Sequence, residues 1–294
     1  MTPQDAAASP TSHPYPVPSA ERVAELARIA EAVAREAGAL IHGGRPAHVE
    51  VAATKSSPQD VVTAMDLASE ALLRRRIAEL SPGDGVLGEE GGFEPGTTGV
   101  TWVVDPIDGT VNYLYGLPAY SVSVAAVVDA PGRAPDPESW TVVAACVFAP
   151  WDGRAFVAGI GQGATCDGRA IRVNPARPLA DSLLGTGFGY VAERRRRQAE
   201  IVADLLPQVR DIRRMGSAAL DLCSLASGGL DLYYERGLAP WDLAAASLIA
   251  TEAGAQVSGL FGRAASSDMT VAGPRGSVGD LIGILEGHGA DSGP

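Results

Sequence analysis

Apolar residues recur along the chain with two different spacings, and these spacings predict where helices and strands lie. Between residues 20 and 41 they recur every three or four positions, which predicts an amphipathic helix with Ser19 as its N-cap. Thr63 and Asp66 have the T-x-x-D spacing of a capping box, so a second helix is expected to begin there. Apolar runs at 100–104, 121–128 and 141–148 predict strands.

The same two spacings continue to the end of the chain. They predict helices at 193–209, 218–226, 240–254 and 280–285, and strands at 183–185, 231–235, 256–260 and 270–272. No internal repeat or clear linker interrupts the pattern. Residues 20–288 are therefore predicted to form one unit, with an N-terminal α+β half at about 20–180 and a C-terminal α/β half at about 181–288. Residues 1–19 are rich in proline and are predicted to be a disordered tail.

Composition and charge narrow the classes of function. The formal net charge of −12 argues against nucleic acid as a partner, since phosphate backbones are held by excess Lys and Arg. No apolar run approaches the ~20 residues of a membrane span, and the N-terminus lacks a signal-peptide pattern, so we expect a cytoplasmic protein. Cys146, Cys166 and Cys223 are expected to be reduced thiols.

Acidic residues follow several predicted strands or begin a predicted helix. Asp105 and Asp108 end the strand that starts at residue 100, and Gly109 and Thr110 follow at once. Glu89 follows a short apolar strand, and Asp242 opens an apolar helix. Hard oxygen ligands and backbone N–H groups at one point suit a divalent cation and a phosphate. Taken singly, the Asp-Pro and Asp-Gly pairs are also common turn formers, and an acid at a helix start also serves as an N-cap.

Taken together, these motifs resemble the Mg²⁺-dependent, lithium-sensitive inositol monophosphatases. The resemblance rests on W-V-V-D-P-I-D-G-T-V-N-Y at 102–113, W-D-L-A-A-A-S-L-I-A-T-E-A-G at 241–254, G-E-E at 88–90 and the segment 55–66. It covers roughly residues 20–287. Two further segments, L-G-T-G-F-G-Y at 184–190 and R-R-M-G-S-A-A-L-D-L-C at 213–223, resemble the actinobacterial inositol-1-monophosphatases.

This resemblance implies a fold, an activity and a cofactor. The fold is an α/β (α+β) layered α-β-α-β-α sandwich of the sugar-phosphatase type. The activity is hydrolysis of myo-inositol 1-phosphate and related phosphomonoesters by a metal-activated water. Two to three Mg²⁺ ions are expected at the site, with Li⁺ as an inhibitor. The resemblance also implies a homodimer, since family members are commonly homodimers.

The resemblance also assigns roles to individual residues. The first Mg²⁺ is held by Glu89, Asp105 and the carbonyl of Ile107. The second is held by Asp105, Asp108 and Asp242. A third, weaker ion is bound by Glu89 and water molecules. Asp66 and Thr110 orient the attacking water beside the Glu89-bound metal. The N–H groups of Gly109 and Thr110 receive the phosphate. The ring hydroxyls are bound by Gly216, Ser217, Ala218, Glu235, Asp108 and Asp242.

Several alternatives share these motifs. Histidinol-phosphate, fructose-1,6-bisphosphate or nucleotide 3′-phosphatase activity would use the same chemistry, and some family members are non-catalytic binding proteins of the transcription machinery. A bisphosphate substrate predicts a second basic cluster near the site, for which Arg213 and Arg214 are the candidates. The arginine run 194–197 is interpreted as a solvated helix face. The segment 159–164 fits G-x-G-x-x-A but is predicted to be a glycine-rich hairpin.

Three positions depart from the family pattern. Tyr113 stands where the family has Phe, and Ala246 and Ala255 stand where it has Gly. None of these changes removes a predicted ligand. They bear on lithium sensitivity and substrate choice.

Overall fold

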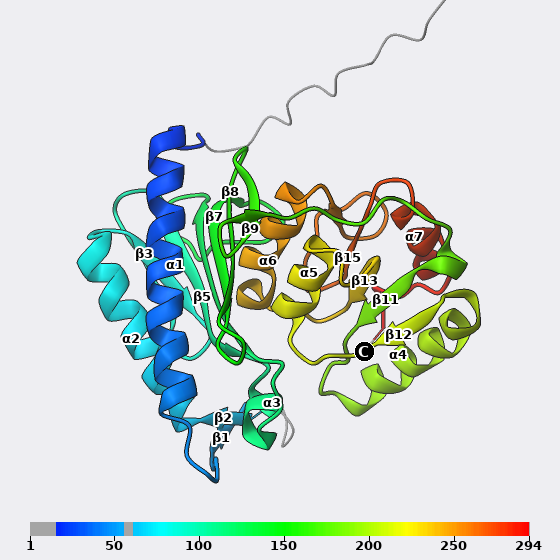
Figure 1. Cartoon of the computed structure of the whole chain (residues 1–294), viewed down its shortest axis with the longest axis horizontal. Coiled ribbons are helices and arrows are strands. Elements are labelled where there is room, and N and C mark those ends of the chain that lie inside the picture. The colour runs from blue at the N-terminus through cyan, green and yellow to red at the C-terminus, as the bar shows by residue number, and fades with distance from the viewer. Residues whose placement is uncertain (1–15, 56–60, 294) are drawn as a thin grey trace, which may run out of the picture.

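The computed structural model describes residues 16–55 and 61–293, and within these ranges an eight-stranded and a five-stranded sheet alternate with three layers of helices. In Figure 1 the layers run from α1 and α2 on the left, through the larger sheet, α5 and α6, and the smaller sheet, to α4 and α7 on the right. The expected α-β-α-β-α sandwich is confirmed. Most of the predicted disordered tail lies outside the described residues, as does part of the 55–66 motif.

The larger sheet holds eight strands in the order β10-β9-β8-β7-β6-β5-β3-β4. Neighbouring strands are antiparallel except β3 and β5, which run parallel. The strands are β3 (Gly85–Gly88), β4 (Gly92–Glu94), β5 (Val100–Asp108), β6 (Ser121–Val128), β7 (Thr141–Ala149), β8 (Arg154–Gly159), β9 (Gly163–Cys166) and β10 (Arg169–Ala170).

Helices α1 (Ala20–Gly43) and α2 (Ala64–Leu80) cover the outer face of this sheet. The predicted caps are confirmed: the Ser19 side chain accepts the amide hydrogen of Arg22, and Thr63 and Asp66 form a capping box. A buried cluster joins both helices to alternate residues of the central strands. Its members include Leu26, Val33, Ile41, Leu73, Trp102, Val104, Val122, Val124 and Cys146.

Helices α5 (Ala218–Ala226) and α6 (Pro240–Glu252) form the central layer between the two sheets. Both are apolar on nearly every side, because they pack against a sheet on one face and against each other or the second sheet on the rest. This core includes Val103, Ala125, Val147, Leu222, Cys223, Leu243, Ala246, Ile249, Tyr233 and Ala272. Ala246, one of the departures from the family pattern, is fully buried here.

The smaller sheet holds five strands in the order β12-β11-β13-β15-β14. They are β11 (Leu183–Thr186), β12 (Asp211–Arg213), β13 (Leu232–Glu235), β14 (Gln256–Ser258) and β15 (Thr270–Gly273). Helices α4 (Ala192–Leu205) and α7 (Val278–Gly287) cover its outer face, where a third core joins Leu184, Ile201, Leu205, Leu232, Val271, Leu281 and Leu285. The predicted helix 193–209 ends at Leu205, since Pro207 lacks an amide hydrogen and a 3₁₀ turn, Leu206–Gln208, follows.

Smaller elements complete the frame. A hairpin of β1 (Val51–Thr54) and β2 (Val61–Thr63) precedes α2, a short helix α3 (Thr110–Tyr115) follows β5, and a 3₁₀ turn, Leu179–Asp181, precedes β11. The segment 159–164 forms the predicted glycine-rich hairpin turn between β8 and β9. The Glu252 carboxylate accepts the amide hydrogens of Gly161 at 2.8 Å and Gly163 at 2.7 Å. No helix in the described ranges is long and apolar enough to cross a membrane.

Candidate active site

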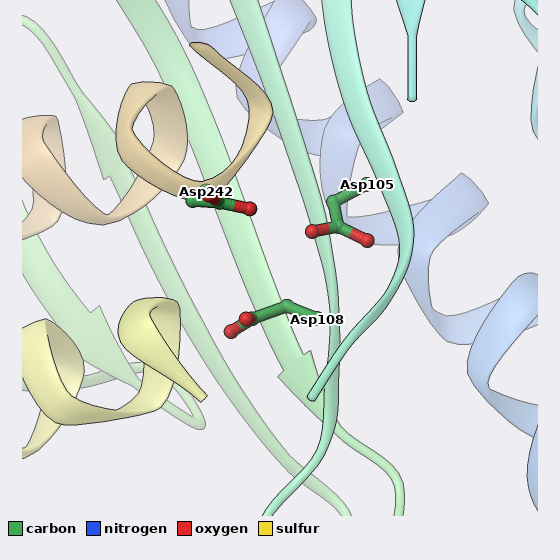
Figure 2. Close-up of side chains that lie close together, drawn as sticks. All are labelled: Asp105, Asp108 and Asp242. Carbon is green, nitrogen blue, oxygen red and sulfur yellow. The ribbon is translucent and has the colours of Figure 1, made fainter. Parts of the chain in front are cut away.

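The site begins with an irregularity at the end of β5. Asp105 pairs with Ser123 of β6 and Asp108 pairs with Ser121, so three residues of β5 advance against two residues of β6. In a regular strand, residues three apart face opposite sides of the sheet. The extra residue of this bulge turns the chain so that both carboxylates reach one place, as Figure 2 shows. Pro106 contributes to this irregularity, because it has no amide hydrogen for the ladder.

Asp108 is held in place by the start of α5. Its Oδ2 atom accepts hydrogen bonds from the Ser217 hydroxyl, from the Ala219 amide at 2.9 Å and from the Ser121 hydroxyl at 3.3 Å. Asp242 is the third residue of α6 rather than its N-cap, and its carboxylate accepts the Ala239 amide hydrogen at 2.7 Å. The helix-capping interpretation of Asp242 is thus correct in part, since one oxygen caps the helix.

One carboxylate oxygen from each of Asp105, Asp108 and Asp242 lies within 4.8 Å of the other two. We call these three residues, together with Glu89, the carboxylate cluster. Glu89 directly follows β3, and its Oε1 atom lies 2.7 Å from the Lys55 ammonium, which also contacts Glu90 at 2.7 Å. The cluster therefore combines acids from the larger sheet with one acid from the central helical layer.

A residue that the sequence prediction missed supports the turn after β3. The Glu70 carboxylate on α2 accepts the amide hydrogens of Glu90 at 2.7 Å and Gly91 at 2.8 Å. A Cβ atom at Gly88 would lie 2.5 Å from the Glu70 carboxylate, so glycine here leaves room for that group. The motif G-E-E is thus shaped by a glutamate about twenty residues earlier, which no local pattern indicates.

Burial and mutual repulsion make the carboxylate cluster basic. Burial holds the pKa of Asp105 well above its usual range, and the negative charges of Glu89, Asp108 and Asp242 raise it further. The pKa of Asp242 is raised well above its usual range by burial and by its acidic neighbours, and burial is the main cause of the raised pKa of Asp108. Burial also raises the pKa of Glu89 to about 7, against the Lys55 charge. A cation among these oxygens would relieve the repulsion.

Thr110 and Asp66 lie beside this cluster. The Thr110 hydroxyl is 3.3 Å from Asp66 Oδ1 and 3.0 Å from the Ile107 carbonyl oxygen. The other Asp66 oxygen accepts the Thr63 amide hydrogen at 2.8 Å and the Thr63 hydroxyl hydrogen. Asp66 is fully buried, and burial raises its pKa. The capping box that begins α2 therefore also aims a carboxylate at Thr110.

A cavity of about 300 Å³ lies against these groups. All the predicted site residues line it except Asp66 and Ser217, which contact the lining residues Thr110 and Asp108. Glu235 is held there by the Tyr233 hydroxyl at 2.6 Å, and burial raises its pKa to about 7. A Cβ atom at Gly187 would lie 2.0 Å from the Glu235 carboxylate, so glycine makes room for this acid.

Three residues at or behind this cavity were not predicted: Asp221, which does not line it, and the lining residues Arg194 and Arg236. Asp221 on α5 is 1% exposed, and burial followed by the charges of Glu235 and Asp108 raises its pKa to about 8. Arg194, Arg214 and Arg236 all line the cavity, together with Phe188 and Tyr190. The interpretation of 194–197 as a solvated helix face is therefore wrong for Arg194. Of the two basic candidates, Arg214 lines the cavity and Arg213 instead pairs with Asp211 at 2.5 Å.

Two departures from the family pattern are accommodated by their surroundings. Tyr113 is fully buried, and its hydroxyl donates to the Ile41 carbonyl at 2.8 Å, so the polar atom added relative to Phe has a partner on α1. Ala255 is buried in the turn between α6 and β14. The three cysteines are free thiols, as expected.

Comparisons with known proteins agree with this arrangement. The sequence model of the inositol monophosphatase family matches residues 22–286. Inositol-1-monophosphatase SuhB of Mycobacterium tuberculosis (strain H37Rv) is 43% identical over 283 residues, with 90% of this chain and 94% of the relative covered. Nus factor SuhB of Escherichia coli K12 is 38% identical over 239 residues, with 81% and 86% covered. The solved structure of Mycobacterium tuberculosis SuhB superimposes with a TM-score of 0.75 at 40% identity, covering 92% of this chain and 98% of that one.

Proposed function

The chain belongs to the inositol monophosphatase family and is a phosphatase, and on this premise we propose that it hydrolyses myo-inositol 1-phosphate and related phosphomonoesters with Mg²⁺ as cofactor. The observation that carries the proposal is the convergence of Asp105, Asp108 and Asp242 to within 4.8 Å beside a polar cavity. Relatives named inositol-1-monophosphatase, which cover nine tenths of this chain, support the choice of substrate.

The donor set fits Mg²⁺. Every side-chain donor in the carboxylate cluster is an oxygen, the ligand type that Mg²⁺ prefers, and the raised pKa values of its acids reflect a charge that a divalent cation offsets. In the proposal, Glu89, Asp105 and the Ile107 carbonyl hold one ion and Asp105, Asp108 and Asp242 hold another. When bound, Mg²⁺ supplies activation of water and neutralisation of the phosphate charge.

Thr110 and Asp66 would prepare the attacking water. The Thr110 hydroxyl accepts a hydrogen bond from water and donates its own hydrogen to Asp66 Oδ1, which lies 3.3 Å away. Asp66 keeps this orientation because its second oxygen is occupied by Thr63. The dyad can receive the proton that water loses as its oxygen bonds to phosphorus. Such positioning contributes part of the barrier lowering, on the order of 20 kcal/mol or more, that phosphomonoester hydrolysis needs.

The remaining lining groups would hold the substrate. The amides of Gly109 and Thr110 receive the phosphate oxygens, because they lie where the chain turns from β5 into α3. Gly109 has φ +92°, and a Cβ atom there would lie 2.8 Å from the Ala119 carbonyl oxygen, so only glycine suits this turn. The polyol hydroxyls would be bound by the lining residues Gly216, Ala218, Glu235, Asp108 and Asp242, and by Ser217, which contacts Asp108 from behind the lining.

Three further properties are part of the proposal and follow from the family. They are inhibition by Li⁺, a homodimeric assembly and a cytoplasmic location. The division of residues 20–288 into two halves likewise stays a prediction.

The test is phosphate release by the purified protein from inositol 1-phosphate, histidinol phosphate, fructose 1,6-bisphosphate and adenosine 3′,5′-bisphosphate, in Mg²⁺ and in EDTA. We expect Mg²⁺-dependent turnover with inositol 1-phosphate among the good substrates. Preference for another ester would keep the chemistry and change the substrate. Absence of turnover with every ester would refute the proposal.

A second candidate function comes from the relatives named Nus factor SuhB, at 35–38% identity. A binding role in transcription does not need the carboxylate cluster. Complementation of a strain that lacks the corresponding gene separates the two functions: survival of function in Asp105→Asn favours the binding role, and its loss favours hydrolysis.

A further inference from the structure

The cavity has a basic side that the proposed hydrolysis does not use. Three arginines line it, each from a different part of the C-terminal half: Arg194 from the first turn of α4, Arg214 from the loop before α5, and Arg236 from the residue after β13. We call these three residues the arginine rim. In a chain with a net charge of −12, three guanidinium groups on one cavity indicate a local need for positive charge.

Two glycines make room for Arg194. A Cβ atom at Gly237 would lie 2.8 Å from Arg194 Nη1, and one at Gly189 would lie 3.0 Å from Arg194 Cδ. Gly237 also has φ +96°, a conformation that favours glycine. The guanidinium therefore lies between the segment after β11 and the segment after β13, in the wall of the cavity.

Arg236 is held close to Arg194 by the end of the chain. Its Nη1 and Nη2 atoms donate to the carbonyl oxygens of Ser292 at 3.0 Å and Gly293 at 2.7 Å. Burial and then the charge of Arg194 lower the pKa of Arg236. The charges of Asp268 and Asp291 offset this lowering in part, and an anion near both guanidinium groups would add to the relief.

Arg214 connects this basic region to the part of the cavity proposed to bind the polyol. The guanidinium group of Arg214 packs against Gly216, where an added Cβ atom would lie 2.6 Å from Arg214 Nη1. Its charge lowers the pKa values of Glu235 and Asp221, against the burial that raises them. The rim thus begins next to the backbone segment proposed to bind the ring and continues to Arg194 and Arg236.

We propose that the arginine rim binds a second phosphate, carried on the alcohol part of the substrate, so that phosphorylated polyol phosphates are better substrates than the matched monophosphates. This inference rests on the proposed function of the same site. A guanidinium group offers paired N–H donors that match phosphate oxygens, which favours arginine over lysine here.

The second phosphate is bound and is not cleaved. Water oxygen bonds to the phosphorus atom at the carboxylate cluster, the ester P–O bond breaks, and the alcohol oxygen takes a proton. The alcohol leaves with its other phosphate still attached. The product therefore retains the group that the rim binds, so it should also inhibit the reaction.

The test compares inositol 1-phosphate with inositol 1,4-bisphosphate, followed as release of the 1-phosphate at saturating Mg²⁺. We expect kcat/KM to be at least tenfold higher for the bisphosphate in the unaltered protein. The ratio of the two kcat/KM values should fall about tenfold in Arg194→Gln and in Arg236→Gln, and recover in part in Arg194→Lys. Arg195→Gln, in the same arginine run but outside the cavity lining, is the matched control and should keep the ratio.

A second measurement does not depend on turnover. Calorimetric titration with inositol 4-phosphate, which keeps only the rim phosphate, should give a Kd at least tenfold weaker in Arg194→Gln than in Arg195→Gln. An equal ratio for the two esters in the unaltered protein, or unchanged binding in Arg194→Gln, would overturn the inference while leaving hydrolysis of the monophosphate intact. If inorganic phosphate inhibition alone responds to Arg194→Gln, the rim binds the free anion and the inference is also wrong. Binding without hydrolysis of either ester would refute the proposed function alone.

Discussion

The carboxylate cluster and the arginine rim face the same cavity but are built in different ways. Asp105 and Asp108 are 1% and 7% exposed and are fixed by a strand bulge and the start of a buried helix. Arg214 is exposed, Arg194 is half-buried in the first turn of α4, and Arg236 is half-buried directly after β13. In the proposed function, buried backbone geometry would set the chemistry, whereas longer side chains nearer the surface would set the choice of substrate.

The largest effect should come from the carboxylate cluster itself. Asp105→Asn removes a proposed ligand of two ions, and we expect phosphatase activity to fall at least ~10³-fold, since metal catalysis carries most of the rate. In EDTA the same variant should unfold at a higher temperature than the unaltered protein, because two carboxylates ~4 Å apart repel by about 4 kcal/mol at an effective dielectric of ~20. Asp152→Asn, at an exposed turn, is the control for both measurements. Retained activity would remove Asp105 from the mechanism.

The next largest effect tests whether Thr110 orients the attacking water, a role separate from the charge of the carboxylate cluster. Thr110→Val should lower kcat by ~10²-fold or more with little change in KM, within the range of proton-transfer catalysis. Thr110→Ser keeps the hydroxyl, so its kcat should stay within about tenfold of the value for the unaltered protein, as expected for a partial loss of positioning. Thr97→Val, on an exposed loop, is the matched control. A rise in KM with kcat unchanged would instead make Thr110 a binding group.

A smaller effect distinguishes the two regions by their response to salt. Exposed charges are screened beyond ~10 Å at 0.1 M salt, whereas buried ones are screened much less. Raising NaCl from ~0.05 to ~0.3 M should raise KM for inositol 1,4-bisphosphate several-fold more than for inositol 1-phosphate. The extra dependence should disappear when Arg194 and Arg236 are both changed to Gln. An identical salt dependence for both esters would show that the rim and the cluster are not distinct.

The smallest effect concerns stability near Asp221, which lies between the two regions. The pKa of Asp221 is raised to about 8 in the folded protein and is about 4 in the unfolded protein. Between about pH 4 and pH 8 the folded protein therefore holds a proton on Asp221 that the unfolded protein has lost. Stability should therefore fall as pH rises from 6 to 8, by up to ~3 kcal/mol or a few degrees in Tm. Asp221→Asn should flatten this part of the Tm profile measured in Mg²⁺, whereas Asp280→Asn, at an exposed position of α7, should not. An unchanged slope would assign the pH dependence to other acids.

The two regions also differ in how far the sequence predicts them. Asp105 and Asp108 are found because proline and glycine mark the end of an apolar strand, and Asp66 because a capping box has fixed spacing. Arg194 carries no such signal: it is one of four arginines in a row, and only the glycines at 189 and 237, distant in sequence, place it in the cavity. Glu70 and Asp221 were missed for the same reason, since tertiary contacts alone give them their roles.

Element boundaries show a related limit. The apolar residues Val49 and Val51 predict a strand at 49–51, but the strand is observed at Val51–Thr54, where every residue is exposed and apolar spacing gives little guidance. By contrast, α1 follows its predicted stripe closely, because ten of its residues are buried against the sheet and α2. Prediction from the sequence succeeds where burial imposes a strict period and fails where edges and loops do not.

The crossing from the larger to the smaller sheet occurs once, between β10 and β11, and it divides the site. Glu89, Asp105 and Asp108 precede this crossing, and Asp242 and the arginine rim follow it. A chain severed at the crossing yields two fragments, neither of which has a complete set of ligands. Their reassociation would bury the apolar faces of α5 and α6 again, so turnover would report complementation between the fragments directly.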